Sequence, residues 1–450
     1  MKGELLMVEK IPADASPEKR LFISLITRDI SLIDAFLEIM DNSINAALEP
    51  FAANLKTADD YQRLLSEGKV TPKVQIDVTV SPKKIVVIDN APGISSKMAA
   101  DHVFKFGRGD AEADSSDRLS VYGIGLKRAM FKSGNKIEII SDHRQGGFEL
   151  KLNVREWARV QKEPWTFEIT PRPPEKSHFG TRITITDLHE EVRRRIDDGL
   201  FLDQLRERIS RTYSFFIGRI VDITVNNVPT PKESFDIGEN FGNAKFESGK
   251  VSCNITAGIA STANEKYRDR NGGWFVFCNG RAILFADKST LTGWGVAGLP
   301  IFQPKHRPFL GIVFFVSTDP ELLPWTTTKA SVDVENAVWQ LAKRHMVTVG
   351  RVITGYLDKR YKRDGTEVSP EELQDISGEK VSVLSAAVAE PREFRIPTKS
   401  HLKTTTIQYK AKTEDVKKIE SYLHKPNMGG SEVGRYTFNY FLKNEVREVE

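Results

Sequence analysis

The sequence predicts an α+β protein, because segments with a helical repeat are interspersed with short apolar runs typical of strands. In residues 31–48, apolar side chains recur at three- and four-residue steps, which predicts a helix ended by Pro50. Residues 74–80 and 84–89 alternate or run apolar on either side of a Ser-Pro turn, which predicts two paired strands.

The next part of the chain combines a long loop, a helix and more strands. Residues 107–125 are rich in Gly, Asp and Ser, and a loop of this length is usually functional. A helix is expected to open near Gly125. Four further runs are predicted to be strands of one sheet, at residues 136–141, 147–153, 165–170 and 181–186.

A second group of elements follows residue 190. A helix is predicted over 200–218 and a long helix from about 334 to 362, with strands at 219–226, 274–278, 281–285 and 311–316. Residues 364–403 are rich in Glu, Ser and Pro, and residues 404–410 resemble a strand before two short amphipathic helices. These patterns predict domains at 1–190 and 191–363, a linker at 364–403, and a small C-terminal α/β module at 404–450.

Composition excludes several classes of protein. Of 450 residues, 40% are apolar and 28% charged, which excludes a wholly disordered chain. No apolar run approaches the ~18 residues of a membrane span, and no secretory signal is expected. With only Cys253 and Cys278 and scattered histidines, we expect no disulfide framework or structural zinc, and a cytoplasmic location. The net charge of +4 alone does not indicate a nucleic-acid binder.

The first chemical motif is FLEIMDNSINAA, residues 36–47. Glu38 and Asn42 are four residues apart on the predicted helix, so both side chains project from one face. A carboxylate can orient and deprotonate a water, and an amide oxygen is a hard ligand suited to Mg²⁺. A solvated helix face with a polar pair is the simpler interpretation of this segment alone.

The second motif is IVVIDNAPGIS, residues 85–95. Asp89 comes directly after an apolar strand and before a Pro-Gly turn, where a carboxylate can accept a hydrogen bond from an adenine amino group. Gly93 allows the backbone to approach a base closely. An ordinary turn is the alternative interpretation, because Asp, Asn, Pro and Gly are common turn residues.

Two further segments are weak individually. In YGIGLKRAMFKSG, residues 122–134, Gly123 and Gly125 open a helix whose N–H groups and dipole favour phosphate, and Lys127 adds a positive charge. Glycine before a helix is also often only a flexible entry. In HFGTRITITDL, residues 178–188, Gly180 and Thr181 place a small residue and a hydroxyl at the start of a strand.

Together, in this order and spacing, the four segments resemble the GHKL ATPase superfamily of gyrase-type topoisomerases, ninety-kilodalton heat-shock chaperones, histidine kinases and MutL. The resemblance covers residues 20–190 and extends more loosely to about 360. It implies a Bergerat-type α/β sandwich followed by a transducer-like domain related to ribosomal protein S5, with ATP and Mg²⁺ as cofactors.

The same resemblance implies roles for individual residues. Glu38 activates the attacking water and Asn42 holds Mg²⁺. Adenine is read by Asp89, with Gly93 beneath the base and Thr181 bridging to it. The 107–125 loop is the ATP lid, and phosphates are cradled by Arg108, Gly123, Ile124, Gly125, Leu126 and Lys127. The usual adenine motif is Asp-x-Gly-x-Gly, whereas this chain has Ala91 at the first glycine.

A lysine from the second domain completes the implied site. LPWTTTKASVD, residues 323–333, is a polar loop containing Lys329, whose ammonium suits a phosphoryl oxygen during transfer. An exposed loop lysine is the alternative interpretation. Because a site split between domains makes hydrolysis depend on docking, we expect a homodimer on ATP binding, with residues 1–20 reaching across.

Within the superfamily the chain resembles MORC-type proteins most, as a prokaryotic member. Glu38 favours hydrolysis over transfer to a side chain, which distinguishes it from histidine kinases. The lid sequence FGRGDAEADSSDRLSVYGIG differs from the Gly-Phe-Arg-Gly-Glu-Ala lid of MutL, whereas its Phe-Gly start and Tyr-Gly-x-Gly-Leu-Lys end resemble MORC proteins.

Three functions are compatible with such an ATP cycle. The first is a clamp on DNA or on a nuclease or helicase partner, as in phage defence, since residues 343–363 carry seven basic residues against Asp358. A second cluster is Arg193–Arg195, and both clusters also fit plain solvated surfaces. The second function is a chaperone-like protein-remodelling switch that docks through residues 404–447. The third is a nucleotide sensor with little hydrolysis. No membrane association is expected.

Overall fold

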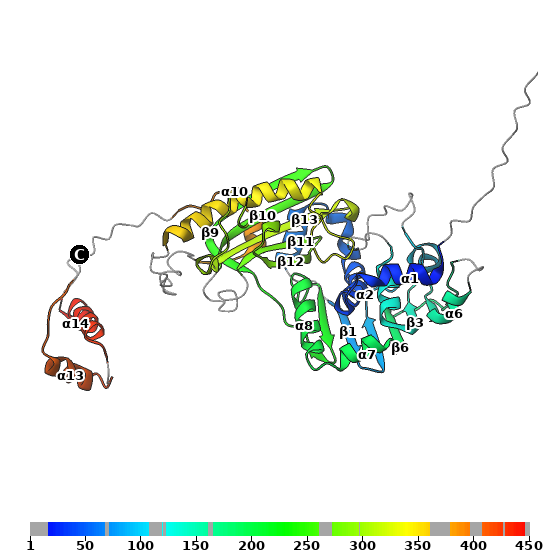
Figure 1. The fold of residues 1–450 in the computed structure, drawn as a ribbon, viewed down its shortest axis with the longest axis horizontal. Coiled ribbons are helices and arrows are strands. Elements are labelled where there is room, and N and C mark those ends of the chain that lie inside the picture. Colours follow the sequence, from blue (N-terminus) through cyan, green and yellow to red (C-terminus); the bar gives the residue numbers. More distant parts are fainter. Residues whose placement is uncertain are drawn as a thin grey trace, which may run out of the picture. The chain divides into compact units, whose positions relative to one another are not determined.

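The chain folds around two β-sheets that belong to one compact unit, residues 1–396, while residues 397–450 form a second unit (Figure 1). The computed structural model describes residues 17–67, 72–107, 119, 123–160, 165–260, 272–296, 298–360, 379–396, 407–425 and 428–445.

The first sheet has eight strands, in the spatial order β5 (Ile169–Pro171), β4 (Phe148–Asn153), β3 (Gly134–Asp142), β6 (Gly180–Leu188), β2 (Lys84–Asp89), β1 (Val74–Val80), β7 (Val221–Val225) and β8 (Val228–Pro229). All neighbours are antiparallel except β1 and β7. In the register of the three central strands, Thr181 lies opposite both Asp89 and Ser141. This pairing brings three strand ends to one edge of the sheet.

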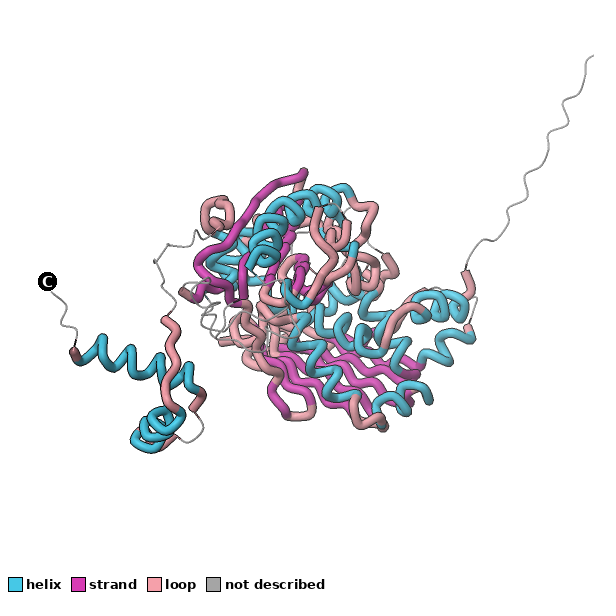
Figure 2. The backbone as a smooth tube through the Cα atoms, turned by 60° about the vertical axis from the view of Figure 1, so that its left-hand side comes forward, coloured by secondary structure: helices cyan, strands magenta, loops and turns pink. Residues whose placement is uncertain are grey.

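Helices cover this sheet (Figure 2). They are α1 (Lys19–Arg28), α2 (Leu32–Leu48), α5 (Gly125–Ser133), α6 (Val154–Arg159), α7 (Glu190–Asp197) and α8 (Phe201–Thr212). The α2 helix begins at Ser31, whose hydroxyl accepts the Asp34 N–H, and its apolar stripe of Phe36, Met40 and Ile44 is buried. The predicted helix over 31–48 is therefore confirmed.

The second sheet has six strands, in the order β12 (Arg281–Asp287), β11 (Gly273–Cys278), β13 (Phe309–Ser317), β10 (Val251–Ala260), β9 (Asp236–Ser248) and β14 (Lys380–Ser382). Successive side chains face opposite sides of a strand. Phe315 therefore meets Trp339 of the long helix α10 (Ala337–Arg360), while Phe314 meets Tyr61 of α3 (Ala58–Glu67) on the other side. The sheet is thus covered on both faces (Figure 1).

Short elements connect these layers. They are the helix α4 (Ser96–Met98), the π-helical turn Ala99–Val103, and 3₁₀ turns at Glu49–Asn54, Thr290–Thr292, Pro304–His306 and Pro320–Leu322. Pro50 lies at the start of the first 3₁₀ turn, which follows α2 directly.

Several boundaries differ from those predicted. The first sheet extends beyond residue 190, because β7 pairs with β1 and β8 pairs with β7. The helix predicted over 200–218 ends at Thr212, and the strand predicted over 165–170 begins only at Ile169. Strands β9 and β10 are absent from the prediction, since β9 has glycine and charged residues where a regular apolar alternation would be expected.

Part of the segment predicted as a linker, 364–403, is folded. Its residues 380–382 form β14 on the edge of the second sheet, and α12 (Val383–Val388) follows with four buried side chains. Only the short run VSVLSAAVA is apolar there, and the surrounding Glu and Pro residues hide it in a composition average. Residues 361–378 and 397–406 lie outside the described part of the chain.

The second unit contains α13 (Thr413–Tyr422) and α14 (Gly430–Asn444). Of the predicted strand at 404–410, residues 407–410 are not in a strand, and residues 404–406 lie outside the described part. Aromatic side chains on both helices are exposed, with Tyr422 at 84% and Phe441 at 58%. Within the described residues, no helix has both the length and the apolar character that crossing a bilayer requires.

Candidate active site

The α2 helix brings Glu38 and Asn42 to one face, as their spacing predicts. The Asn42 amide donates to the Glu38 backbone carbonyl at 3.2 Å, a bond between successive helical turns. Glu38 is only 5% exposed although it is a carboxylic acid. A buried acid requires partners, and a solvated helix face is therefore excluded for Glu38.

Asp89 lies at the end of β2, where three donors fix its carboxylate. The Ser43 hydroxyl donates to Oδ2 at 2.6 Å, and the backbone N–H groups of Ala91 and Thr181 donate to Oδ1 at 3.1 and 3.2 Å. Burial raises the pKa of the Asp89 carboxyl, although these three hydrogen bonds act in the opposite direction. Ser43 therefore links the helix with Glu38 to the strand end with Asp89.

Glycines allow the strand ends around Asp89 to pack closely. Gly93 has a φ of +75°, and a Cβ there would lie 2.1 Å from the Asp142 carbonyl oxygen. A Cβ on Gly180 would lie 2.1 Å from the Asp89 carbonyl oxygen. Both positions therefore require glycine.

A pair of hydroxyls lies beside these glycines. The Thr181 hydroxyl is 2.9 Å from the Ser141 hydroxyl, which also accepts the Ile94 N–H at 2.7 Å. The structure thus brings Asp89, Gly93 and Thr181 together at neighbouring strand ends.

The N-terminus of α5 lies against Glu38. A Cβ on Gly125 would lie 2.0 Å from Glu38 Oε2, so the backbone at the start of this helix approaches the carboxylate directly. Gly123 has a φ of +61°, and Ile124 is the N-cap residue. Leu126 follows in the first turn. The helix start that is predicted to cradle phosphates therefore lies beside Glu38.

Only part of the predicted lid can be placed. Residues 108–118 and 120–122, and with them Arg108, lie outside the described part of the chain. Leu119 is described, and its backbone N–H donates to the Asn45 side chain of α2 at 2.9 Å. One point of the lid segment is therefore attached to the same helix as Glu38.

Lys127 points away from Glu38. Its ammonium donates to the carbonyls of Val103 and Lys105 at 2.8 and 2.7 Å, and the residue is 1% exposed. Burial lowers the pKa of Lys127 to about 8. In this conformation Lys127 holds the segment that leads into the lid, rather than lining the space beside Glu38.

Lys329 reaches Glu38 from the second sheet's side of the unit. It lies in the loop closed by a bridge between Trp325 and Val332, and it is 4% exposed. Its ammonium is 3.1 Å from Glu38 Oε2 and 2.7 Å from Asp41 Oδ2. Burial alone would lower the pKa of Lys329, but Asp41 and Glu38 hold it above its ordinary value. An exposed loop lysine is excluded.

Asp41 has three partners that the sequence did not connect. Besides Lys329, Arg281 Nε lies 2.9 Å from Asp41 Oδ1 and the Tyr213 hydroxyl lies 2.7 Å from it. Burial would raise the pKa of Asp41, but Arg281 and Lys329 hold it below its ordinary value. Asp41 and Ser43 both lie within the first motif, and Arg281 is the one charged residue in the otherwise apolar run RAIL. These were the available sequence signals.

The protein oxygen atoms near Glu38 suit Mg²⁺ only when a bound ligand supplies further oxygen atoms. Within the described residues no group of three His, Cys, Asp or Glu side chains forms a metal site. Asn42 is half-buried and uses its amide nitrogen for Glu38, which leaves its oxygen as a hard ligand. Mg²⁺ typically binds through one or two protein oxygens plus phosphates and water. The residues present therefore fit a magnesium ion carried by a triphosphate.

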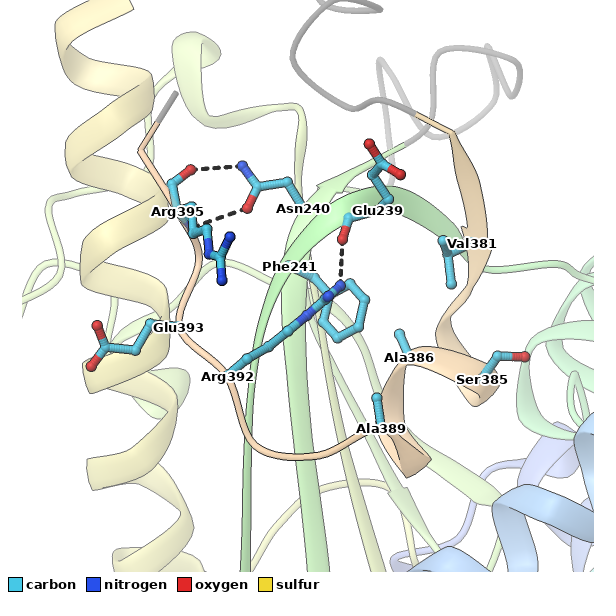
Figure 3. A pocket seen from close by; sticks show the side chains of 10 residues that line it. All are labelled: Glu239, Asn240, Phe241, Val381, Ser385, Ala386, Ala389, Arg392, Glu393 and Arg395. Carbon is cyan, nitrogen blue, oxygen red and sulfur yellow. Dashed lines mark hydrogen bonds between the residues drawn. The ribbon is translucent and has the colours of Figure 1, made fainter. Parts of the chain in front are cut away.

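A separate cavity of about 560 Å³ lies at the edge of the second sheet, between β9, β14, α12 and residues 392–395 (Figure 3). Arg392 stacks on the Phe241 ring at 3.5 Å and donates to the Glu239 carbonyl. None of the residues predicted for the site lines this cavity, whose two arginines are balanced by two glutamates.

Comparison with known proteins finds a family match over part of the first sheet and of the helices beside it. Residues 30–181 match the family described as histidine kinase-, DNA gyrase B-, and HSP90-like ATPase. No curated protein matches the chain. The matched segment contains Glu38, Asn42, Asp89, the α5 entry and Thr181. Residues 30–181 are therefore similar to GHKL-type ATPase domains.

Proposed function

We propose that this protein binds ATP with Mg²⁺, hydrolyses it, and uses the cycle as a nucleotide-gated clamp. The observation that carries the proposal is the meeting of Glu38 from α2 with Lys329 from the 325–332 loop, 3.1 Å apart. A buried base beside a buried ammonium, at the start of a glycine-opened helix, suits a terminal phosphate and the water that attacks it.

Adenine recognition is assigned to the strand ends. Asp89 accepts a hydrogen bond from the adenine amino group. Ser43, Ala91 and Thr181 hold its carboxylate in place. Gly93 keeps the floor of this region free of a side chain. Ala91 is 2% exposed, so its methyl is packed within the protein.

Hydrolysis is assigned to Glu38 and Asn42 of α2 and to Lys329. Glu38 accepts a proton from a water molecule, and the oxygen of that water bonds to the terminal phosphorus. The bond from that phosphorus to the bridging oxygen of ADP breaks. Lys329 balances charge on the phosphoryl oxygens. Asn42 and the phosphates would hold Mg²⁺, which would supply further charge neutralisation.

The ion pair also suggests how the cycle is gated. Before nucleotide binds, Lys329 is shared by Glu38 and Asp41. A terminal phosphate competes for the same ammonium, so its arrival rearranges the contact between α2 and the 325–332 loop. We propose that this change, together with lid closure, produces a homodimer that clamps DNA or a DNA-acting partner, in the manner of a prokaryotic MORC-like protein in phage defence.

The basic residues expected to contact DNA are partly used within the chain. Lys343 donates to the Thr290 carbonyl, and Asp358 pairs with Lys305 and His306. Arg194 and Arg195 pair with acidic neighbours on the surface. A gel shift with duplex DNA at rising salt tests direct DNA binding.

The same ion pair favours a second candidate, a nucleotide sensor with little hydrolysis. If Lys329 stays on Glu38 after ATP binds, the carboxylate is a poor proton acceptor and the complex persists. The two candidates differ in phosphate release, which is fast for the clamp and negligible for the sensor, at equal ATP affinity.

Replacement of Glu38 tests the proposal. Glu38→Gln is expected to lower ATP turnover about 10²–10⁴-fold, as removal of a general base does, with ATP affinity nearly unchanged. Steady-state phosphate release and nucleotide binding measure both, and Glu191→Gln, at an exposed glutamate, is the control. Unchanged turnover in Glu38→Gln, or no ATP affinity at any magnesium concentration, contradicts the proposal. Light scattering with a non-hydrolysable ATP analogue tests the dimer, which a monomeric mass excludes.

A further inference from the structure

Arg281 joins the two halves of the site without facing the space beside Glu38. It is 1% exposed, and its guanidinium spans two partners on different elements. Nε donates to Asp41 of α2 at 2.9 Å, and Nη1 donates to the Lys329 backbone carbonyl at 2.8 Å. One rigid side chain therefore holds the helix of Glu38 and the backbone of Lys329 at a fixed separation.

The loop backbone at Lys329 has a conformation that needs such support. Lys329 has a φ of +52°, in the left-handed region that residues with a side chain seldom adopt. Its N–H donates to the Thr326 carbonyl at 2.8 Å, which closes a turn, and Arg281 binds its carbonyl. This strained turn directs the ammonium towards Glu38 and Asp41.

Arg281 is itself rigidly placed. It follows Asn279 and Gly280, whose φ values of +46° and +82° make the tight turn between β11 and β12. The Asn279 side chain exchanges two hydrogen bonds of 3.0 Å with the Ser317 backbone of β13. A Cβ on Gly280 would lie 2.4 Å from the Phe216 ring, so the turn is packed against the first part of the unit.

A buried ionic cluster is a costly way to hold two elements together, because apolar packing of the same volume is often as stable. What the cluster adds is direction: a guanidinium fork fixes two acceptors in one plane. A lysine at position 281 carries a single ammonium and cannot reproduce that fork.

We propose that Arg281, braced by Asp41 and Tyr213, is the positioning residue that fixes the Lys329 turn at the hydrolysis site. The inference rests on the proposed function for its consequence in turnover. Arg281 acts through Lys329 and touches no nucleotide. Its loss therefore releases the Lys329 ammonium from a fixed position and leaves the adenine wall at Asp89 intact.

The first test measures placement and needs no ATP hydrolysis. The full-length protein is treated with formaldehyde and borohydride, and dimethylation of each lysine is read by peptide mass spectrometry. Lys329 is expected to be protected in the wild type and labelled at least tenfold faster in Arg281→Lys. Lys127, which is also buried but is held by two backbone carbonyls, is the internal control and stays protected. Labelling of both lysines, or of neither, overturns the proposal.

Two further variants keep this test decisive. Arg219→Lys replaces a half-buried arginine, which binds the Ser214 and Phe215 carbonyls, and it is expected to leave Lys329 protected. If Arg281→Lys does not fold, Tyr213→Phe removes only the hydroxyl that donates to Asp41 and to the Leu37 carbonyl, and it is expected to raise Lys329 labelling by a smaller factor. Unchanged labelling in folded Tyr213→Phe then overturns the proposal.

The second test is a double-mutant cycle on turnover. Arg281→Lys is expected to lower kcat about 10²-fold with unchanged KM for ATP, the scale of a misplacement near 1 Å. In a Lys329→Met background the same change is expected to have no further effect, because Arg281 acts through Lys329. Multiplying effects overturn the proposal. Absence of hydrolysis by the wild type overturns the proposed function instead, and the labelling test still decides the role of Arg281.

Discussion

Replacing Lys329 by methionine tests the arrangement of charges at the site most directly. The substitution keeps an unbranched side chain of similar length and removes only the ammonium. In the wild type this ammonium lies 3.1 Å from Glu38 and 2.7 Å from Asp41, and all three residues are at most 5% exposed. Without it, two buried carboxylates share Arg281 as their remaining cation.

The expected loss in the free energy of unfolding is about 3–5 kcal/mol, the usual result of removing one partner from a buried ion pair. That is a large part of the roughly 5–15 kcal/mol by which a domain is stable. Lys151→Met is the matched control, since Lys151 also lies between two glutamates, Glu138 and Glu149, but on the surface. Little change is expected there, because solvent screens exposed pairs.

The loss should also depend on pH in a stated direction. In the wild type Arg281 and Lys329 hold the pKa of Asp41 below its ordinary value despite burial, so Asp41 contributes stability above its unfolded pKa and loses it as pH falls. Without Lys329 the Asp41 pKa rises, and protonation becomes easier in the folded state. The gap between variant and wild type is therefore larger at pH 8 than at pH 5.

Urea unfolding followed by circular dichroism at both pH values measures the gap. Adding Glu38→Gln to Lys329→Met removes one of the two carboxylate charges and is expected to restore part of the stability. Equal stability of Lys329→Met and wild type at pH 8 would refute the reasoning, since it would mean that the carboxylates do not need the ammonium.

Three further predictions concern the neighbouring contacts. Ser43→Ala removes a 2.6 Å hydrogen bond to the buried Asp89 carboxylate. We expect a loss of about 1.5–3 kcal/mol in the free energy of unfolding, and weaker ATP binding by calorimetry. Unchanged ATP affinity would contradict the role given to Asp89. Gly125→Ala places a methyl 2.0 Å from Glu38 Oε2, so we expect the Glu38 side chain to rotate away. ATP turnover should then fall while the melting temperature stays unchanged. Normal turnover would show that Glu38 is not needed in this position. For Lys127, whose pKa is lowered by burial to about 8, the charged form opposes folding. Wild-type stability should therefore rise relative to Lys127→Met by about 3 kcal/mol between pH 7.5 and 10.5, and a flat difference in urea titrations would exclude this shift.

Much of the first sheet and of the helices beside it could be predicted from the sequence alone. The 31–48 helix and the strands at 74–80 and 84–89 carry strong local periodicity, and burial of one face requires only that these patterns meet a partner. The four-residue spacing puts Glu38 and Asn42 on one face of a helix wherever that helix packs. Asp89 at a strand end and Gly125 at a helix start are likewise set by their immediate neighbours in the chain.

Contacts between distant segments were decided by the tertiary structure. No local pattern states that Ser43 bonds Asp89, or that Arg281 spans Asp41 and the Lys329 carbonyl, because these pairs depend on how the two sheets pack. Likewise β7 joins the first sheet through its pairing with β1. Residues 380–388 fold because β14 pairs with the edge of β9 and α12 packs against α3.

Local sequence thus determined which side chains are presented together on one element: the acid and the amide of α2, the aspartate after β2 and the glycines before α5. Only the tertiary structure decided which of them meet, and it added Asp41 and Arg281 as the charges that join α2 to the Lys329 loop. The physical reason is that periodicity and turn chemistry act over a few residues, whereas burial of a charge is settled by whichever opposite charge the packed fold brings within 3 Å.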